Sequence, residues 1–252
     1  MKQIFMIRTA LKFTCKLSLL LIVISCQNNL TKKEPLDKFS IPKLIDDIPL
    51  SNKLKISNSI SISNYPLIGI YPFSRETKII DKEWDTTIKE IEPFSFSGLS
   101  FYIDTTQKLT IQNDSSNSKY IQNFQREHLA FPCYVINETK ILKWLTAQDG
   151  ELVATLEALD SNSIWKPIEV WLWPTCGLSR HKTPIKPNYY ALFKIPIFKG
   201  SFETKLRLKI YINNEIYYSP IYKNYINYSQ FDKPKELTDK NGNFKISFNF
   251  IE

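Results

Sequence analysis

The side chains that most often perform acid-base and nucleophilic chemistry are sparse in this sequence of 252 residues. Histidine occurs only at His128 and His181. Cys176 or Ser179 would be a nucleophile with His181 as a nearby base. Residues so close together on a loop rarely meet in that geometry, so the basic run 179–182 reads better as a solvated turn. Since the sequence also contains no GxSxG elbow, HExxH helix, P-loop or dinucleotide-binding glycine pattern, it predicts no catalytic residue.

Metal and carboxylate chemistry is equally weakly indicated. The histidines and cysteines lack the CxxC or HxH spacing of a zinc site, and residues 81–85 lack the glycine and the terminal glutamate of a calcium loop. The sequence therefore predicts no metal and no cofactor. A hydrolase on a β scaffold would need two carboxylates held about 5 to 9.5 Å apart. The candidates for such a pair are Asp149, Glu151, Glu157 and Glu169.

Large aromatic rings are concentrated between residues 165 and 190. In an extended strand Trp171 and Trp173 point to one face, while Ile168 and Val170 point to the other. If the aliphatic residues face the core, the tryptophans stand on the outside, and three interpretations stay open: rings buried between sheets or under a loop, a surface that stacks sugar rings, or a protein interface. The candidate stacking or interface residues are Trp165, Trp171, Trp173, Arg180, His181 and Tyr189.

The first 25 residues have the pattern of an export signal, in which basic residues precede a short apolar run. The run covers roughly 8 to 10 residues, whereas a permanent membrane-spanning helix needs about 20. We therefore expect removal of this segment and not a transmembrane anchor. The basic residues are Lys2, Arg8, Lys12 and Lys16, and the apolar run is Leu17-Ser18-Leu19-Leu20-Leu21-Ile22-Val23-Ile24.

A cysteine follows the apolar run at the position where a lipid anchor is attached. Val23-Ile24-Ser25-Cys26 has a branched apolar residue at −3, a small residue at −1 and cysteine at +1, which resembles the lipobox of bacterial lipoproteins. The resemblance implies cleavage before Cys26, diacylglycerol on its thiol and usually a further acyl chain, each buried CH₂ adding about 0.8 kcal/mol of attachment. Gln27 is not the aspartate of an inner-membrane retention signal, so we expect an outer-membrane protein that faces the periplasm or the outside.

The remaining cysteines depend on that compartment. Cys15 leaves with the signal, while Cys133 and Cys176 are expected on the oxidising side of the inner membrane. A disulfide between them would close 42 intervening residues and contribute roughly 3 to 4 kcal/mol. The alternative is two separately buried thiols.

The basic charge gives little indication of a nucleic-acid partner. The formal charge of +8 falls to +4 once the four basic residues of the signal are removed, because no acidic residue leaves with them. No cluster of lysine and arginine of the kind that follows phosphates appears. The expected partners are instead the membrane, through lipid on Cys26, and a glycan or an envelope protein.

Short runs with period two predict the fold class. Residues 202–212 alternate between the two sides, and Asn213-Asn214 predicts a hairpin to residues 215–218. Only residues 144–159 compete as a helix, and Gly150 interrupts them. The sequence therefore predicts a mainly β, antiparallel sandwich, either Ig-like or jelly-roll. Shorter predicted strands lie at 54–56, 60–62, 94–96, 101–103, 109–111 and 134–136, with a last strand at 244–250.

Four segments follow from these patterns. Residues 1–25 are the signal and 26–52 are the lipidated cysteine with a flexible tether. Residues 53–118 and 119–252 are two β regions, divided by the polar stretch 113–118, although that stretch could equally be a loop inside one domain.

A second resemblance covers residues 119–231, in which five short segments together look like a pattern found in uncharacterised bacterial lipoproteins. It implies a β-rich extracytoplasmic domain and no known activity. The expected function is a lipid-anchored, non-catalytic module that binds a glycan or an envelope protein, with a structural subunit of an outer-membrane assembly or a carboxylate-based hydrolase as alternatives. The segments are Gln148-Asp149-Gly150-Glu151-Leu152, Glu157-Ala158-Leu159-Asp160, Trp165-Lys166-Pro167-Ile168-Glu169, Cys176-Gly177 and Lys199-Gly200-Ser201-Phe202.

Overall fold

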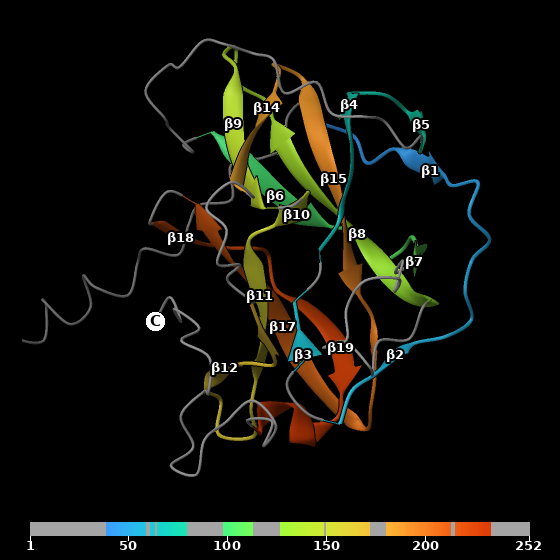
Figure 1. Cartoon of the computed structure of the whole chain (residues 1–252), viewed down its shortest axis with the longest axis vertical. Helices are drawn as coiled ribbons and strands as arrows, with labels where there is room; N and C mark the ends of the chain where they lie inside the picture. The colour runs from blue at the N-terminus through green and yellow to red at the C-terminus, as the bar shows by residue number, and fades with distance from the viewer. Residues whose placement is uncertain are drawn as a thin grey trace, which may run out of the picture. The chain divides into compact units, whose positions relative to one another are not determined.

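The fold is known from a computed structural model, which describes residues 39–58, 61–63, 65–79, 98–112, 127–148, 150–171, 180–212 and 215–232. Within these ranges the regular structure consists of β-strands and one 3-10 turn, Tyr228–Phe231. Most strands pair antiparallel, and two five-stranded sheets share one hydrophobic core (Figure 1). The predicted mainly β, antiparallel sandwich is confirmed.

The first sheet is built around β8, which pairs with β15 on one side and with β6 and β7 on the other. Pro132 lies within β8, in the interval between the residues that pair with β6 and with β7. Its carbonyl accepts a hydrogen bond from Asp104 N at 3.0 Å on that side, so its missing N–H interrupts no ladder. The strands are β4 (Leu67–Pro72), β6 (Leu99–Ile103), β7 (Leu109–Gln112), β8 (Glu127–Asn137) and β15 (Tyr189–Pro196).

The second sheet is built around β17, the strand predicted at residues 202–212. It pairs with β11 on one side and with β18 and β19 on the other. Pro220 separates β18 from β19, and Ser219 closes the gap by accepting a hydrogen bond from Leu208 N at 2.9 Å. The predicted hairpin from residues 202–212 to 215–218 is confirmed. The strands are β11 (Ala154–Leu159), β12 (Trp165–Pro167), β17 (Phe202–Ile212), β18 (Glu215–Tyr218) and β19 (Tyr222–Ile226).

Period two explains how these sheets form one core. Leu206, Leu208 and Ile210 alternate with charged residues along β17 and are fully buried. The facing side of the first sheet contributes Phe131, whose ring meets Tyr222 of β19 edge to face at 6.0 Å. Burial of a leucine or isoleucine side chain stabilises a fold by about 1.5 to 3 kcal/mol, so this interface holds the two sheets together.

Shorter strands complete the described structure. β9 pairs with β10 and β14 in a third sheet, and the described residues of the segment 144–159 that competed as a helix belong mostly to β9, β10 and β11. Three pairs of short strands are parallel and join the N-terminal part of the chain to later segments. The third sheet contains β9 (Lys143–Gln148), β10 (Glu151–Leu152) and β14 (Arg180–Ile185); the parallel pairs are β1 (Lys43–Ile45) with β5 (Glu76–Lys78), β2 (Lys55–Ile56) with β16 (Phe198–Lys199), and β3 (Ser61–Ile62) with β13 (Glu169–Val170).

The predicted tether of residues 26–52 is wrong for its second half, because residues 39–52 belong to the folded body. Phe39 is buried, and its ring centroid lies 5.3 to 5.6 Å from those of Phe73, Tyr134 and Tyr190. Further along, Thr110 Oγ1 donates to the carbonyl of Pro49 at 2.9 Å. These partners are distant in the sequence, so local periodicity could not predict that residues 39–52 pack against the fold. The blue segment from β1 to β2 runs along the right side of Figure 1.

Residues 38–252 form one compact unit. Strands β6 and β7, from the proposed region 53–118, pair with β8 from the proposed region 119–252. The two regions therefore share a sheet and are not separate domains. The predicted strands at 94–96 and 244–250, the dividing stretch 113–118 and the signal segment with Cys26 lie outside the described residues.

Candidate functional site

The side of the second sheet that faces away from the core carries most of the exposed aromatic and charged side chains of that sheet. Directly opposite residues of an antiparallel pair project from the same face. Because the even-numbered residues of β17 face the core, its odd-numbered residues and their partners face outward. We call this surface the outer face; it comprises Thr155, Glu157, Leu159, Trp165, Pro167, Glu203, Lys205, Arg207, Lys209, Tyr211, Ile216, Tyr218, Lys223 and Tyr225.

Arg207 lies at the centre of the outer face. Its guanidinium carbon is 4.2 Å from the ring centroid of Trp165 and 3.9 Å from that of Tyr218. Its Nε and Nη2 atoms donate to Glu157 Oε2 at 2.8 and 2.7 Å. The carboxylate fixes the guanidinium, and the guanidinium in turn fixes two aromatic rings. The result is a preorganised platform of two rings around a neutralised charge.

Part of this platform is open to solvent, since Tyr218 is 48% exposed while Trp165 and Arg207 are half-buried. Beside the platform on β19, Tyr225 is 50% exposed. Ile216 and Ile221 are also exposed nearby, on and between β18 and β19. Large contiguous apolar patches are a feature of docking surfaces, whereas single exposed apolar side chains are common on any protein. The grouping of these side chains on β18, β19 and the connection between them makes this face a candidate docking surface.

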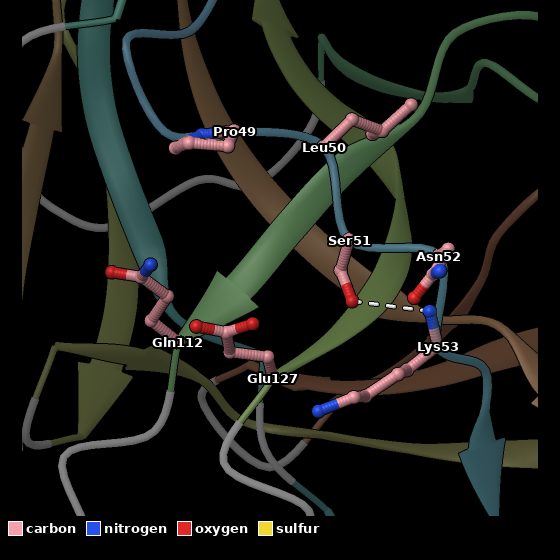
Figure 2. A pocket seen from close by; sticks show the side chains of 7 residues that line it. All are labelled: Pro49, Leu50, Ser51, Asn52, Lys53, Gln112 and Glu127. Atoms are coloured by element: carbon pink, nitrogen blue, oxygen red, sulfur yellow. Dashed lines mark hydrogen bonds between the residues drawn. The ribbon is translucent and has the colours of Figure 1, made fainter.

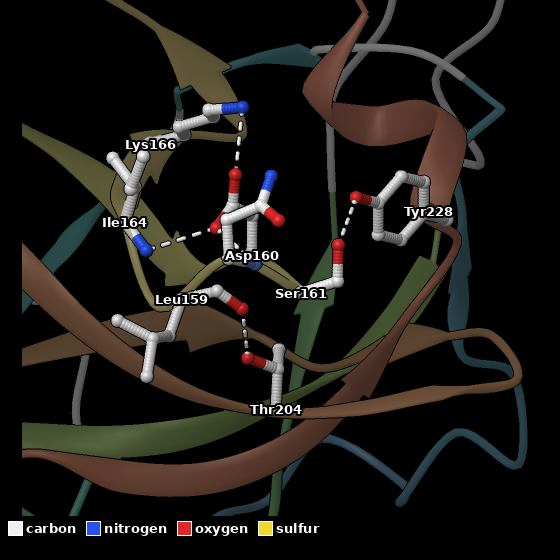
Figure 3. A network of polar contacts seen from close by, with 8 residues as sticks. Leu159, Asp160, Ser161, Ile164, Lys166, Thr204 and Tyr228 are labelled. Carbon is white, nitrogen blue, oxygen red and sulfur yellow. Dashed lines mark hydrogen bonds and ion pairs between the residues drawn. The ribbon is translucent and has the colours of Figure 1, made fainter.

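The turn that carries Trp165 to the sheet edge is held by Asp160. Its Oδ1 atom accepts hydrogen bonds from the backbone N–H groups of Asn162 and Ile164, both at 2.9 Å. Its other oxygen pairs with Lys166 Nζ at 2.7 Å, and this hydrogen-bonded lysine holds the pKa of Asp160 below its usual value. Figure 3 shows the same turn joined to β17 by Thr204 with Leu159 and to the 3-10 turn by Ser161 with Tyr228.

The six residues predicted as one aromatic site do not lie on one element. Trp165 is on the outer face, whereas Trp171 follows β13 and donates its indole N–H to Gln148 of β9 at 3.3 Å. Tyr189 packs against the hydrophobic core from β15. Trp173 lies outside the described residues. Gln148 is also the register partner of Arg180, so the structure places Trp171 beside β14. Trp165 lies on the outer face with neighbours from β17 and β18, and the use of the six residues as one stacking or interface surface stays a prediction.

The interpretation of the basic run 179–182 as a solvated turn is wrong for its described residues. Arg180, His181 and Lys182 belong to strand β14, which pairs antiparallel with β9, and not to a solvated turn. Thr183 and Ile185 are buried while Lys182 is exposed, which is the alternation of a strand. Pro184 made a strand hard to recognise from the sequence. Proline is tolerated in an edge strand, because its missing N–H then faces away from the paired neighbour.

Glu169 is a candidate acid or base that the structure places in the interior. It is fully buried on β13, where Lys55 Nζ lies 3.3 Å from its Oε1 and the hydroxyl of Tyr65 donates to its Oε2. Burial, together with the Glu169 charge, raises the pKa of the Tyr65 hydroxyl well above its usual value. An anion matched by an ammonium and a phenol in this way is a structural group.

The other proposed carboxylates have separate environments. Glu157 is taken up by Arg207 on the outer face, Glu151 lies on β10, and Asp149 is outside the described residues. Glu157 and Glu169 thus each have a cationic partner of their own. This arrangement gives no support to a pair of facing carboxylates beside Trp171.

A shallow hollow of about 330 Å³ lies between the N-terminal segment and the strands β7 and β8 (Figure 2). Lys53 and Glu127 contribute opposite charges to its wall. Because Glu127 is the one carboxylate among the described lining residues, the hollow suits weak binding of a small polar molecule better than acid-base catalysis. The lining residues are Pro49, Leu50, Ser51, Asn52, Lys53, Gln112 and Glu127.

Cys133 is a free, fully buried cysteine on β8, and burial raises the pKa of its thiol. This observation favours the alternative of separately buried thiols. Cys176 lies outside the described residues, so its pairing stays a prediction. Within the described ranges, no cluster of three or more histidine, cysteine or carboxylate side chains has the geometry to hold a metal ion, and no helix has the length and hydropathy to span a membrane.

Comparisons with known proteins return no match, neither to a protein family, nor to a curated protein, nor to a solved structure. A function therefore has to be inferred from the surface chemistry of the chain itself.

Proposed function

We propose that the chain is a lipid-anchored protein of the bacterial cell envelope that binds glycan without catalysis, through the outer face of its second sheet. The observation that carries this proposal is the position of the Arg207 guanidinium on the solvent-facing side of the sheet. Its central carbon lies 4.2 Å from the ring centroid of Trp165 and 3.9 Å from that of Tyr218. Aromatic rings held in a fixed orientation stack on the apolar faces of sugar rings at little entropic cost.

The mixed character of the outer face favours glycan over a protein partner. Lys205 and Lys223 stand among the tyrosines and are exposed. The buried centre of a protein interface is depleted in lysine, because each ammonium loses its hydration there. A glycan leaves much of such a surface wet and offers hydroxyl groups to the charged side chains.

The anchor is part of the same proposal. Cys26 follows an export signal in a lipobox-like sequence, and lipid at this position would keep the binding surface at the membrane. We propose attachment to the outer membrane, on either its periplasmic or its outer side.

A glycan array tests this function. The full lipidated protein in detergent is expected to bind a subset of glycans, and the double variant W165A/Y218A is expected to lose about tenfold in affinity, since each ring contributes on the order of 0.5 to 1.5 kcal/mol. The control I141A removes an exposed apolar side chain outside the second sheet and should bind as the parent does.

Two results would contradict the proposal. A silent array with the folded, lipidated protein rules out glycan as the ligand. A protein that co-purifies from membranes and is lost in W165A/Y218A, together with a silent array, assigns the outer face to a protein interface instead.

A further inference from the structure

Two lysines on the outer face stand directly opposite each other. Lys205 of β17 and Lys223 of β19 are register partners, so their side chains project from the same face of neighbouring strands. Both are exposed, and among the described residues no ion pair involves either ammonium. Like charges opposite each other in a sheet are destabilising. Such a pair gains from an anion that lies between the two ammonium groups.

The carboxylates of the outer face do not supply that anion. Glu157 is held by Arg207 through two contacts of 2.7 and 2.8 Å. Glu203 accepts a hydrogen bond from the neutral Tyr225 hydroxyl at 3.4 Å and keeps its charge, but among the described residues it forms no ion pair with Lys205 or Lys223. Two ammonium groups against one carboxylate leave this end of the outer face with a net positive charge.

The lysine pair lies within reach of the aromatic platform. Trp165 is opposite Leu159 of β11, and Leu159 borders β17 at the level of Lys205, so about two strand spacings, roughly 10 Å, separate Trp165 from Lys205. Tyr218 is opposite Lys209, four residues along β17 from Lys205, which corresponds to about 13 Å. A ligand that touches both must be longer than one sugar ring.

From this juxtaposition we propose that the outer face binds an acidic oligosaccharide. A carboxylate of the ligand lies between Lys205 and Lys223, and neighbouring sugar rings stack on Trp165 and Tyr218. This inference rests on the proposed glycan-binding function and adds the chemical class of the ligand, a polymer that contains uronic acids.

The test compares two ligands that differ only in charge. Polygalacturonate oligosaccharides and the same oligosaccharides with methyl-esterified carboxyl groups are titrated into the full lipidated protein in detergent, by calorimetry. The free-acid form should bind at least about tenfold more tightly, and its affinity should fall as salt is raised, because exposed charge pairs are screened. The variant K205Q/K223Q should lose this preference, while the matched control K140Q/K186Q, with two exposed lysines outside the second sheet, should keep it.

The outcomes separate the inference from the function on which it rests. Equal binding of acid and ester, lost in W165A/Y218A, overturns the acidic ligand but leaves glycan binding standing. Binding of poly-glutamate as tight as that of the oligosaccharide, unchanged in W165A/Y218A, shows non-specific attraction of polyanions and overturns the inference as well. Failure of acid, ester and the glycan array together overturns the proposed function.

Discussion

Glu169 is fully buried, although the alternation of the sequence around it predicts a solvent-exposed side chain. Ile168 and Val170 are both buried, and strict alternation would then put Glu169 beside Trp171 on the opposite, solvent-facing side. Strand β13 is instead covered on both sides, since β3 and Lys55 reach it from the N-terminal part of the chain. A carboxylate tolerates such a position because a cation and a phenol compensate its lost hydration.

Replacing Glu169 with glutamine should lower the free energy of unfolding by about 3 to 5 kcal/mol, because it removes the carboxylate with which buried Lys55 pairs. The double variant K55M/E169L should recover most of that loss, since it removes both charges and fills the space with apolar atoms. Urea denaturation at constant m value measures both effects.

The exposed pair of Lys43 and Glu76 provides the control. Its atoms lie 3.5 Å apart, but both side chains are more than half exposed, so E76Q should change stability by less than about 1 kcal/mol. If E169Q were as mild as E76Q, the buried pair would have no special structural role.

Asp160 gives the fold a predictable response to acid. Its pKa is lowered in the folded state by Lys166 and by the backbone N–H groups of the turn, so the folded protein retains the charge at a pH where the unfolded chain takes up a proton. This stabilisation is present above the unfolded pKa of about 3.9 and is lost as the pH falls through the lowered folded pKa.

Thermal unfolding of the parent and of D160N between pH 7 and pH 2.5 tests this. The parent should be more stable near neutral pH, and the difference between the two should shrink below about pH 4. A difference that stays constant over the whole range would show that the aspartate acts without its charge.

At the scale of elements, the long alternating strand was the most predictable part of the chain. Apolar residues recur at every second position of 202–212 except Thr204, so the side facing the core was evident without any partner. By contrast, β1, β2 and β3 have two or three residues each, and their partners lie far along the chain. Such strands exist because of tertiary contacts, which local pattern cannot reveal.

The candidate site shows the same division. Trp165 was singled out because large aromatic rings are concentrated between residues 165 and 190, but its neighbours on the outer face come from β17 and β18, which the sequence did not connect with it. The register of β11 with β12 and with β17 brings them together. Since pairing order between strands depends on the whole fold, aromatic spacing along the chain pointed to Trp171 and Tyr189 instead.

The close approach of β16 and β19 leads to a prediction about Gly200. An added Cβ at this position would overlap the backbone of Ile226 and Asn227, at the end of β19. G200A should therefore destabilise the protein by about 1 to 3 kcal/mol and loosen β19, which hydrogen exchange of the amides of residues 222–226 detects.

Gly150 provides a different kind of glycine as a control. It has a φ of 78°, and an added Cβ would meet no atom within 4 Å, so G150A should cost about 1 to 2 kcal/mol through backbone strain alone. Its effect should not reach the amides of β19. Equal exchange in G200A and the parent would show that β19 accommodates the added methyl group.

For the molecule as a whole, the sequence predicted the fold class but not where the folded body begins. The mainly β prediction depended on composition and alternation, which are properties of many residues at once. That residues 39–52 belong to the folded body depends on single contacts, such as those of Phe39 with Tyr134 and Tyr190. The sequence around Phe39 is polar, so it gives no sign of these contacts.

The packing of Phe39 limits how far the protein can reach. With lipid on Cys26, as proposed, thirteen residue steps separate the anchor from this packed side chain. Thirteen steps span at most about 45 Å when fully extended. Copies held so close to one surface would meet a polymeric ligand as a two-dimensional array, in which each further contact is intramolecular. Avidity would then allow a weak single site to hold a long polysaccharide firmly.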